Sequence, residues 1–173
     1  TATAVQSKCS VQQFFRFFLG GSPLKERGFE IISTYQDKAV ELPKRNTAAS
    51  AGYDIRAAED VLLAPQAYAM VPTGIKAYMK RDEALFIYIR SSLAVKDHLT
   101  LTNSIGVIDA DYYNNPKNEG HIFLALLNRG DKPVQIEKNM RIAQGIFQKY
   151  LLTDDDDANV IKRIGGFGST GKV

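Results

Sequence analysis

The feature that most constrains the fold is a series of short segments with a period of about two, which runs from Gly28 to about Tyr150. In A-L-F-I-Y-I-R, residues 84–90, every second side chain from Leu85 to Ile89 is aliphatic. Successive side chains of a strand point to opposite faces, so this segment has one fully apolar side. The pattern therefore predicts a strand with one buried face.

Similar short runs recur along the chain and are separated by turn residues. They are F-E-I-I-S (29–33), Y-D-I-R-A (53–57), V-L-L-A (61–64), A-Y-A-M-V (67–71), G-I-K-A-Y-M (74–79), L-T-L-T-N (99–103), I-F-L-A-L-L-N (122–128), V-Q-I-E (134–137) and I-A-Q-G-I-F (142–147). Their spacing predicts an all-β domain of the sandwich or jelly-roll type. S-S-L-A-V-K, residues 91–96, is expected to form one short helix.

Composition limits the class of protein. The chain has 173 residues, of which 45% are hydrophobic and 24% charged, so we expect one globular domain with one good core. The net charge of +3 is too small to indicate a nucleic-acid surface. A single cysteine, Cys9, excludes an internal disulfide, and two histidines do not favour a zinc site. These features fit a reducing compartment, and we expect a cytoplasmic protein.

The N-terminal region, residues 1–25, has no assigned role. No apolar run reaches membrane-spanning length, and F-F-R-F-F-L, residues 14–19, is short and contains Arg16. We interpret this region as an accessory extension; if it is a targeting segment instead, a nuclear or organellar location becomes the alternative. The predicted organisation is this extension, a β domain over residues 26–152 and a C-terminal arm over residues 153–173.

Two features of the C-terminal arm are distinctive. The acidic run D-D-D-D, residues 154–157, is interpreted as a solvated linker, because adjacent positions do not converge on one ion as an alternating calcium loop does. G-G-F-G-S-T-G, residues 165–171, follows close to the end of the chain. Glycines leave the backbone mobile and expose its N–H groups, so we expect this segment to become ordered only on a ligand.

The internal stretch with the most chemistry is N-S-I-G-V-I-D-A-D-Y-Y, residues 103–113. If it is a regular strand, Asp109 and Asp111 share one face. Two carboxylates on one face indicate either general-base chemistry or a cation-dependent site. They are also compatible with plain solubilising residues at a turn or sheet edge. This segment alone does not separate the readings.

A second candidate is R-S-S-L-A, residues 90–94, where an apolar strand gives way to the expected helix. Hydroxyls and helical N–H groups beside a guanidinium suit a phosphate, although an N-cap serine with a surface arginine is the plainer reading. A-G-Y-D-I, residues 51–55, and R-I-A-Q-G, residues 141–145, are uninformative when each is taken alone.

The ordered combination is far more specific than its parts. A-G-Y-D-I, R-S-S-L-A, G-V-I-D-A-D-Y, R-I-A-Q and G-G-F-G-S-T-G resemble, in order and spacing, the five motifs of the trimeric dUTPase family. The resemblance runs from about Gly28 to the C-terminus. It implies a β jelly-roll (β-clip) homotrimer that hydrolyses dUTP to dUMP and pyrophosphate with Mg²⁺ at sites between subunits. Such an enzyme limits uracil incorporation into DNA and supplies dUMP for dTMP synthesis.

The resemblance also implies residue roles around the nucleoside. Asp109 matches the carboxylate that activates the attacking water. Tyr112 matches the tyrosine beneath the deoxyribose, whose ring leaves no space for a 2′-hydroxyl. The expected uracil pocket consists of Asn103 and the backbone of Gly106, Val107 and Ile108.

Other matched positions serve the triphosphate. Arg90 and Ser91 are expected to contact phosphates, and Gln144 the phosphates and the attacking water. Ser92 is expected mainly at a subunit contact, while Asp54 and Arg141 match a supporting pair. The resemblance implies that Mg²⁺ is held by the triphosphate and water, with no direct protein ligand.

The arm carries the remaining expected contacts. Phe167 matches the aromatic that stacks on uracil, and Gly168, Ser169 and Thr170 match the segment that receives the γ-phosphate. The family usually has an arginine three positions before the double glycine. Here that position is Lys162, and Arg163 follows it, so either side chain is a candidate for the γ-phosphate.

One loop departs from the family pattern. D-Y is usually followed by a short R-G turn, whereas here residues 113–120 read Y-N-N-P-K-N-E-G. The longer loop is interpreted as a spacer, because surface loops tolerate insertion at little cost, or as a partner-binding element. The alternatives to dUTP hydrolysis are the activity of a related dCTP deaminase, which needs a pocket for the cytosine amine, and the role of a sensor that binds dUTP without turnover.

Overall fold

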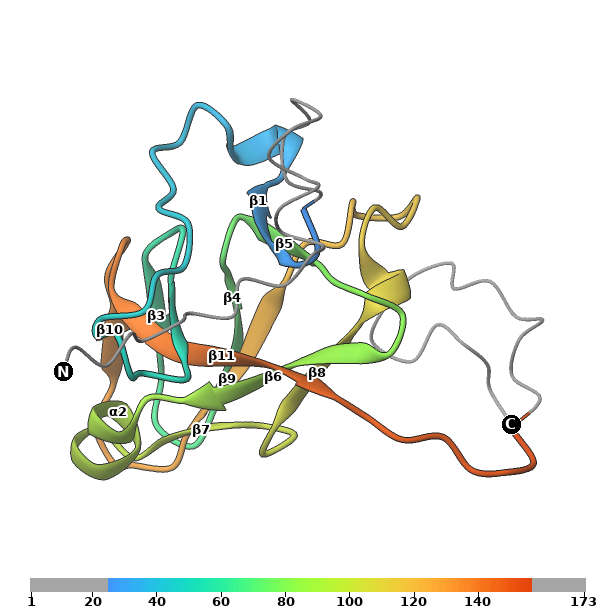
Figure 1. Ribbon diagram of the computed structural model, residues 1–173. Coiled ribbons are helices and arrows are strands. Elements are labelled where there is room, and N and C mark those ends of the chain that lie inside the picture. Colours follow the sequence, from blue (N-terminus) through green and yellow to red (C-terminus); the bar gives the residue numbers. More distant parts are fainter. Residues whose placement is uncertain (1–24, 157–173) are drawn as a thin grey trace, which may run out of the picture.

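The computed structural model describes residues 25–156, which form an antiparallel β fold with one short α-helix (Figure 1). The strands are β1 (Gly28–Ile31), β2 (Tyr53–Arg56), β3 (Val61–Leu63), β4 (Tyr68–Pro72), β5 (Ile75–Tyr78), β6 (Glu83–Ile89), β7 (Leu99–Leu101), β8 (Gly106–Asp109), β9 (Phe123–Asn128), β10 (Val134–Ile136) and β11 (Arg141–Lys149). The helices are α2 (Ser91–Lys96) and two 3₁₀ turns, η1 (Ser33–Tyr35) and η2 (Ala110–Tyr112). The prediction of an all-β domain with one short helix is confirmed.

The strands form two main sheets and two strand pairs. The larger sheet has the order β2-β11-β6-β8, and the second has the order β4-β9-β7. The pairs are β1-β5 and β10-β3, and all the pairings are antiparallel. Strand β6 lies inside the larger sheet, because β11 pairs along one edge and β8 along the other. Residues far apart in the sequence therefore meet on neighbouring strands.

The core lies between the sheets and follows the alternation seen in the sequence. Leu85 and Ile87 of β6 are buried, whereas Phe86 and Tyr88, which follow each of them, are only partly covered. The other large core side chains come from nearly every strand and from α2: Ile55, Leu63, Val71, Ile75, Leu93, Leu99, Leu101, Ile122, Leu124, Leu126, Ile136 and Ile142. One continuous apolar core thus holds the sheets together.

The expectation that Asp109 and Asp111 share a strand face was wrong. Strand β8 ends at Asp109, which pairs with Ala84 near the start of β6, and η2 begins at Ala110. The chain before β6 turns away, with the Glu83 N–H donating to the Lys80 carbonyl, so β8 has no partner beyond Asp109. The period of two therefore stops between the two carboxylates.

Helix α2 begins where the sequence predicted, but its N-cap is not a serine. Arg90 occupies the N-cap position with an extended backbone, and no side chain caps the helix. Both hydroxyls of Ser91 and Ser92 remain on exposed residues. Among residues 25–156, no helix is long and apolar enough to cross a membrane.

Candidate active site

A carboxylate supported by three side chains lies on the larger sheet. Asp54 of β2 pairs in register with Gln144 of β11. One oxygen of Asp54 accepts hydrogen bonds from Asn46 Nδ2 at 2.7 Å and from an Arg141 guanidinium nitrogen at 2.9 Å. Arg90 Nε lies 3.7 Å from the other oxygen. The Asp54–Arg141 pair implied by the sequence is present, and it orients the second arginine, Arg90, as well.

These groups line a shallow hollow of about 280 Å³, which we call the polar pocket. Its lining residues are Asn46, Ser50, Gly52, Asp54, Arg90, Ser91, Ser92 and Gln144. A guanidinium, three hydroxyls and two amides line it, and this donor set suits a phosphate group. The structure thus brings Arg90, Ser91 and Gln144 together, as predicted from the sequence, and it adds Asn46, which the sequence analysis missed because one asparagine in a loop carries no pattern.

A glycine makes room in the polar pocket. A Cβ atom on Gly52 would lie 2.6 Å from Gln144 Oε1, far inside van der Waals contact. The glycine of A-G-Y-D-I is therefore required so that the Gln144 amide can stand beside Asp54. This contact gives a physical reason for a motif that was uninformative in isolation.

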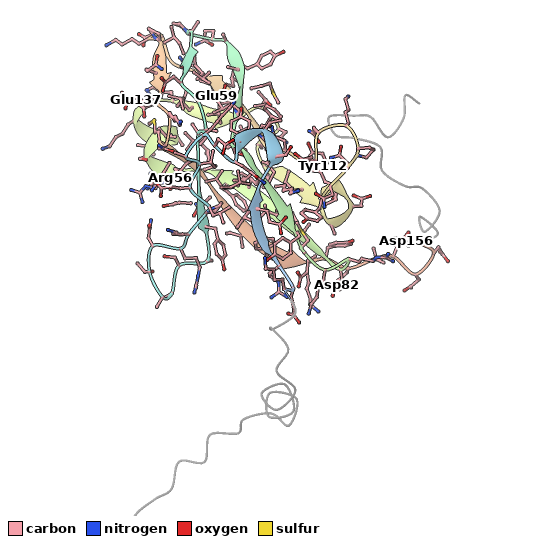
Figure 2. All side chains as sticks on the ribbon, turned by 90° about the horizontal axis from the view of Figure 1, so that it is seen from above. Arg56, Glu59, Asp82, Tyr112, Glu137 and Asp156 are labelled. Carbon is pink, nitrogen blue, oxygen red and sulfur yellow. The ribbon has the colours of Figure 1, made fainter. Side chains whose placement is uncertain are left out.

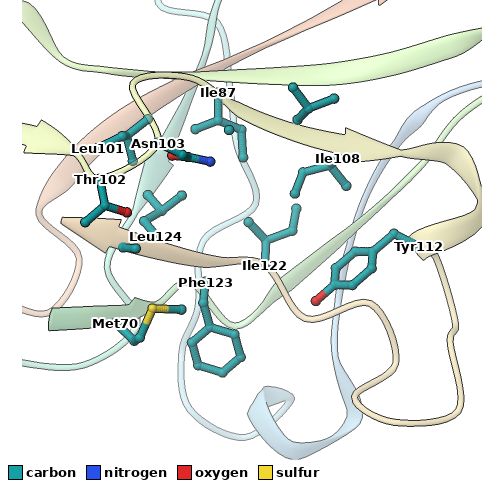
Figure 3. Close-up of a pocket in the computed structure, with 13 residues that line it drawn as sticks. Met70, Ile87, Leu101, Thr102, Asn103, Ile108, Tyr112, Ile122, Phe123 and Leu124 are labelled. Atoms are coloured by element: carbon teal, nitrogen blue, oxygen red, sulfur yellow. The ribbon is translucent and has the colours of Figure 1, made fainter. Parts of the chain in front are cut away.

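A second cavity, of about 310 Å³, opens beside the tight turn that joins β7 to β8, and we call it the hairpin cavity (Figure 3). The two strands do not pair with each other: β7 pairs with β9, and β8 pairs with β6. It is lined by Met70, Ile87, Leu101, Thr102, Asn103, Gly106, Val107, Ile108, Tyr112, Ile122, Phe123, Leu124 and Ala125. Its wall is mostly apolar, with one amide, from Asn103. All five residues expected around the uracil and deoxyribose line this one cavity.

Tyr112 forms one wall of the hairpin cavity and is only 5% exposed. Its hydroxyl donates to the His121 carbonyl at 2.9 Å and accepts from Asn118 Nδ2 at 2.8 Å. The ring is therefore held at its far end by the 113–120 loop. Sequence reasoning did not find Asn118, because polar residues in a turn usually face solvent.

Asp109 lies elsewhere, in a hollow that Arg81, Asp111 and Tyr150 also line. It pairs with Ala84, whereas Arg90 follows six positions later, just beyond the far end of β6. At roughly 3.3 Å per residue, the two positions are about 20 Å apart along the strand. Figure 2 shows Tyr112, which follows β8, and Arg56, at the end of β2, on different sides of the molecule. One chain therefore does not bring Asp109 to its own polar pocket.

His121, whose carbonyl accepts from the Tyr112 hydroxyl, is kept neutral by burial. Burial lowers the pKa of His121 from 6.5 to about 4, although the nearby carboxylates of Glu59 and Glu119 oppose that shift. Its Nε2 accepts a hydrogen bond from the Gly74 N–H at 2.9 Å, a bond that a protonated ring cannot accept. His121 is thus a structural acceptor beneath the cavity wall.

The described part of the chain contains no group of three or more His, Cys, Asp or Glu side chains placed to hold a metal ion. The arm residues predicted to contact substrate, Lys162, Arg163, Phe167, Gly168, Ser169 and Thr170, lie outside the described residues. The same holds for most of the N-terminal extension.

Comparisons with known proteins agree with this geometry. The dUTPase family model matches residues 38–171. The deoxyuridine 5′-triphosphate nucleotidohydrolase of Lactococcus lactis is 51% identical over 149 residues, which cover 86% of this chain and 99% of that protein. The crystal structure of dUTPase from Streptococcus mutans superposes with a TM-score of 0.70 at 50% identity, covering 73% of this chain and 98% of that one.

A more distant structure shares the fold alone. A mutant dUTPase of phage phi11, described with a coordinated structural Mg(II) ion, matches with a TM-score of 0.63 at 20% identity and covers 76% of this chain and 95% of that one. The family-model match extends through the glycine-rich arm and, with the Lactococcus relative, spans nearly all of the β domain. The chain belongs to the dUTPase family.

Proposed function

We propose that this protein hydrolyses dUTP to dUMP and pyrophosphate. The observation that carries the proposal is the 51% identity to the Lactococcus deoxyuridine 5′-triphosphate nucleotidohydrolase along nearly that protein's whole length. The geometry supports it, because the residues matched to the phosphates and to the nucleoside in the described chain line two pockets whose chemistry fits the two halves of the substrate. The polar pocket suits phosphates, and the hairpin cavity suits a base and a sugar.

The reaction is a displacement at phosphorus. Asp109 accepts a proton from a water whose oxygen attacks the α-phosphate, and the bond from the α-phosphorus to the bridging oxygen breaks. The bridging oxygen leaves with pyrophosphate, and the attacking oxygen stays on dUMP. Arg90 and Ser91 hold the phosphate oxygens, while the Gln144 amide orients the water. Asp54 keeps Arg90 and Arg141 in place without touching the reacting atoms.

The hairpin cavity accounts for the choice of base and sugar. The Asn103 amide and the backbone from Gly106 to Ile108 bind the uracil edge, within walls too close for a 5-methyl group. The Tyr112 ring lies under the deoxyribose and excludes a 2′-hydroxyl by contact. A cytosine-specific deaminase would need acceptors aimed at the exocyclic amine, and the 51% identity to the Lactococcus nucleotidohydrolase favours dUTP hydrolysis over that alternative.

The residues present fit Mg²⁺ that is bound through the substrate. The carboxylate of the polar pocket, Asp54, is already bonded to Arg141 and Asn46, and within the described chain no acidic cluster competes for an ion. A cation held by phosphate oxygens and water needs neither the Asp54 carboxylate nor an acidic cluster. When bound, Mg²⁺ neutralises part of the triphosphate charge.

The active protein is proposed to be a homotrimer with its sites between subunits. Because Asp109 lies about 20 Å along β6 from Arg90 of the same chain, a complete site needs Asp109 from another copy. Apolar surface supports this assembly: Leu151, just beyond β11, is 96% exposed, and Leu152 is also exposed. Neighbouring leucines that one chain leaves in water are suited to burial against another copy.

The C-terminal arm is proposed to close the site over bound nucleotide. Phe167 stacks on the uracil, while Gly168, Ser169 and Thr170 receive the γ-phosphate together with Lys162 or Arg163. Closure of this kind excludes water from the reacting phosphates. The proposed location is the cytoplasm, because a chain with a single cysteine fits a reducing compartment.

The test is release of pyrophosphate from dUTP, dCTP, dTTP and UTP in parallel, with Mg²⁺ and with a chelator. Fast release from dUTP alone, lost with the chelator, is expected. Saturable dUTP binding without release would instead support the sensor function. Ammonia release from dCTP would support the deaminase.

A further inference from the structure

The 113–120 loop is built around a single asparagine side chain that faces the hairpin cavity wall. Asn118 Nδ2 donates to the Tyr112 hydroxyl at 2.8 Å. Its Oδ1 accepts from Asn115 Nδ2 at 2.8 Å and from the Gly120 N–H at 3.1 Å. Since the Tyr112 hydroxyl also donates to the His121 carbonyl, both its proton and its acceptor capacity are used.

A second asparagine, Asn115, holds the Asn118 side chain in position. Asn115 is only 4% exposed, and its amide also donates to the Tyr112 carbonyl at 2.9 Å. Its Oδ1 accepts from the backbone N–H groups of Lys117 and Asn118, at 3.1 and 3.2 Å. This turn aims the Asn118 side chain at the tyrosine. Side-chain amides whose oxygen and nitrogen are both hydrogen-bonded give a rigid local structure.

The path of the loop back to β9 is equally constrained. Gly120 has a positive φ of 83°, and a Cβ there would lie 2.6 Å from the Tyr112 carbonyl oxygen. The chain can pass so close to Tyr112 only with a glycine at this position. The loop therefore encloses the backbone of Tyr112 as well as its hydroxyl.

Separate contacts fasten the outer side of the loop to the body. Lys76 of β5 is largely buried and donates from Nζ to Asn114 Oδ1 at 2.6 Å, with Glu119 Oε1 3.6 Å away. Glu119 Oε2 accepts from both the N–H and the hydroxyl of Ser33, at 2.9 and 2.6 Å. These bonds hold the loop without touching Tyr112, so they provide a control for the inner contacts.

We propose that Asn118 is a positioning residue for sugar selectivity: it fixes the Tyr112 ring from behind and so sets how strictly the hairpin cavity rejects a 2′-hydroxyl. The inference rests on the proposed function, in which Tyr112 lies under the deoxyribose. A ring held only by the His121 carbonyl has more freedom to tilt and give way to the extra oxygen. The inward direction of both asparagines favours this role over the spacer or partner-binding readings of the loop.

The test compares kcat/KM for dUTP and UTP in Asn118→Ala. Loss of this part-buried hydrogen bond is expected to lower the dUTP-to-UTP ratio about fivefold, through a larger relative rate with UTP. Tyr112→Phe removes the same hydrogen bond together with the one to the His121 carbonyl, so it is expected to lower the ratio by at least as large a factor. In the double variant the two effects are not additive, because both act through one contact.

The control variant is Ser33→Ala, which removes one loop hydrogen bond on the outer side and is expected to leave the ratio unchanged. If Asn118→Ala does not fold, Tyr112→Phe removes the contact between Asn118 and the hydroxyl while leaving both loop asparagines in place. A folded variant with an unchanged ratio, or additive effects with Tyr112→Phe, would overturn the inference alone. Absence of dUTP hydrolysis by the wild type would overturn the proposed function and this inference with it.

Discussion

The polar pocket and the wall of the hairpin cavity are held in place by different kinds of structure. In the polar pocket, strand register sets Asp54 beside Gln144 on neighbouring strands, and the support is an ion pair across the sheet. At the cavity wall, Tyr112 lies in a 3₁₀ turn outside any strand, and an irregular loop holds it through side-chain amides. Backbone ladders constrain the first region, whereas a few specific side chains constrain the second.

This difference means that the two regions tolerate change differently. A ladder of backbone hydrogen bonds is independent of most side chains, so the polar pocket is sensitive mainly where a Cβ has no room. The cavity wall is sensitive to single polar atoms, because a buried group that loses its partner costs about 1 to 3 kcal/mol. Substitutions at Asp109, in the polar pocket and at the cavity wall should therefore change different measured quantities.

The largest effect is expected from Asp109→Asn. The amide keeps the shape of the side chain but cannot accept the proton from water, so turnover of dUTP should fall by about a thousandfold. Binding of dUTP should persist, because both pockets remain intact. Steady-state turnover and equilibrium binding of a non-hydrolysable dUTP analogue measure the two quantities. Turnover within a few fold of wild type would remove Asp109 as the base.

A second, smaller effect is expected from Gly52→Ala. The added Cβ would lie 2.6 Å from Gln144 Oε1, so the amide must move out of the polar pocket. Misplacing a positioning group by about 1 Å can cost about a hundredfold in rate, and we expect a loss of that order in kcat for dUTP.

The matched control for this change is Gly106→Ala in the hairpin cavity. There the nearest atom to an added Cβ is Ile87 Cβ at 3.3 Å, a tight contact that a small shift relieves. We expect it to affect KM for dUTP more than kcat, because Gly106 lines the cavity proposed to bind the base. Equal losses of kcat in both variants would mean that the polar pocket is no more rigid than the cavity.

The same contrast explains what the sequence could and could not predict. Alternation located the strands, and the motifs named the residues that strand register then gathers, including Asp54, Arg141 and Gln144. The end of β8 at Asp109 was missed, because it depends on where the partner strand β6 begins. Asn46 and Asn118 were missed for a related reason: their partners, Asp54 and the Tyr112 hydroxyl, are found only when loops fold back onto the sheet.

The smallest expected effect is a loss of folding stability in acid, and it arises at His121 on the side of the hairpin cavity. The pKa of His121 is about 4 in the folded protein and 6.5 as its ordinary value, so below pH 6.5 the unfolded chain takes up the proton more readily. Stability is therefore complete above pH 6.5 and is lost as the pH falls toward 4. Between pH 7 and pH 5 the loss is about 2 kcal/mol in the free energy of unfolding. Of the charged groups around the ring, Glu59 and Glu119 raise its pKa and Lys38 lowers it.

Denaturant titrations at pH 7 and pH 5 measure this loss. His121→Gln can still accept from the Gly74 N–H but does not titrate, so its stability should change less between the two pH values. His98→Asn, at an exposed residue with a positive φ of 52° that asparagine tolerates, should keep the wild-type dependence. An equal loss in wild type and His121→Gln would place the acid sensitivity on other groups. A loss confined to His121 would mean that acid destabilises the region that supports Tyr112 through the His121 carbonyl.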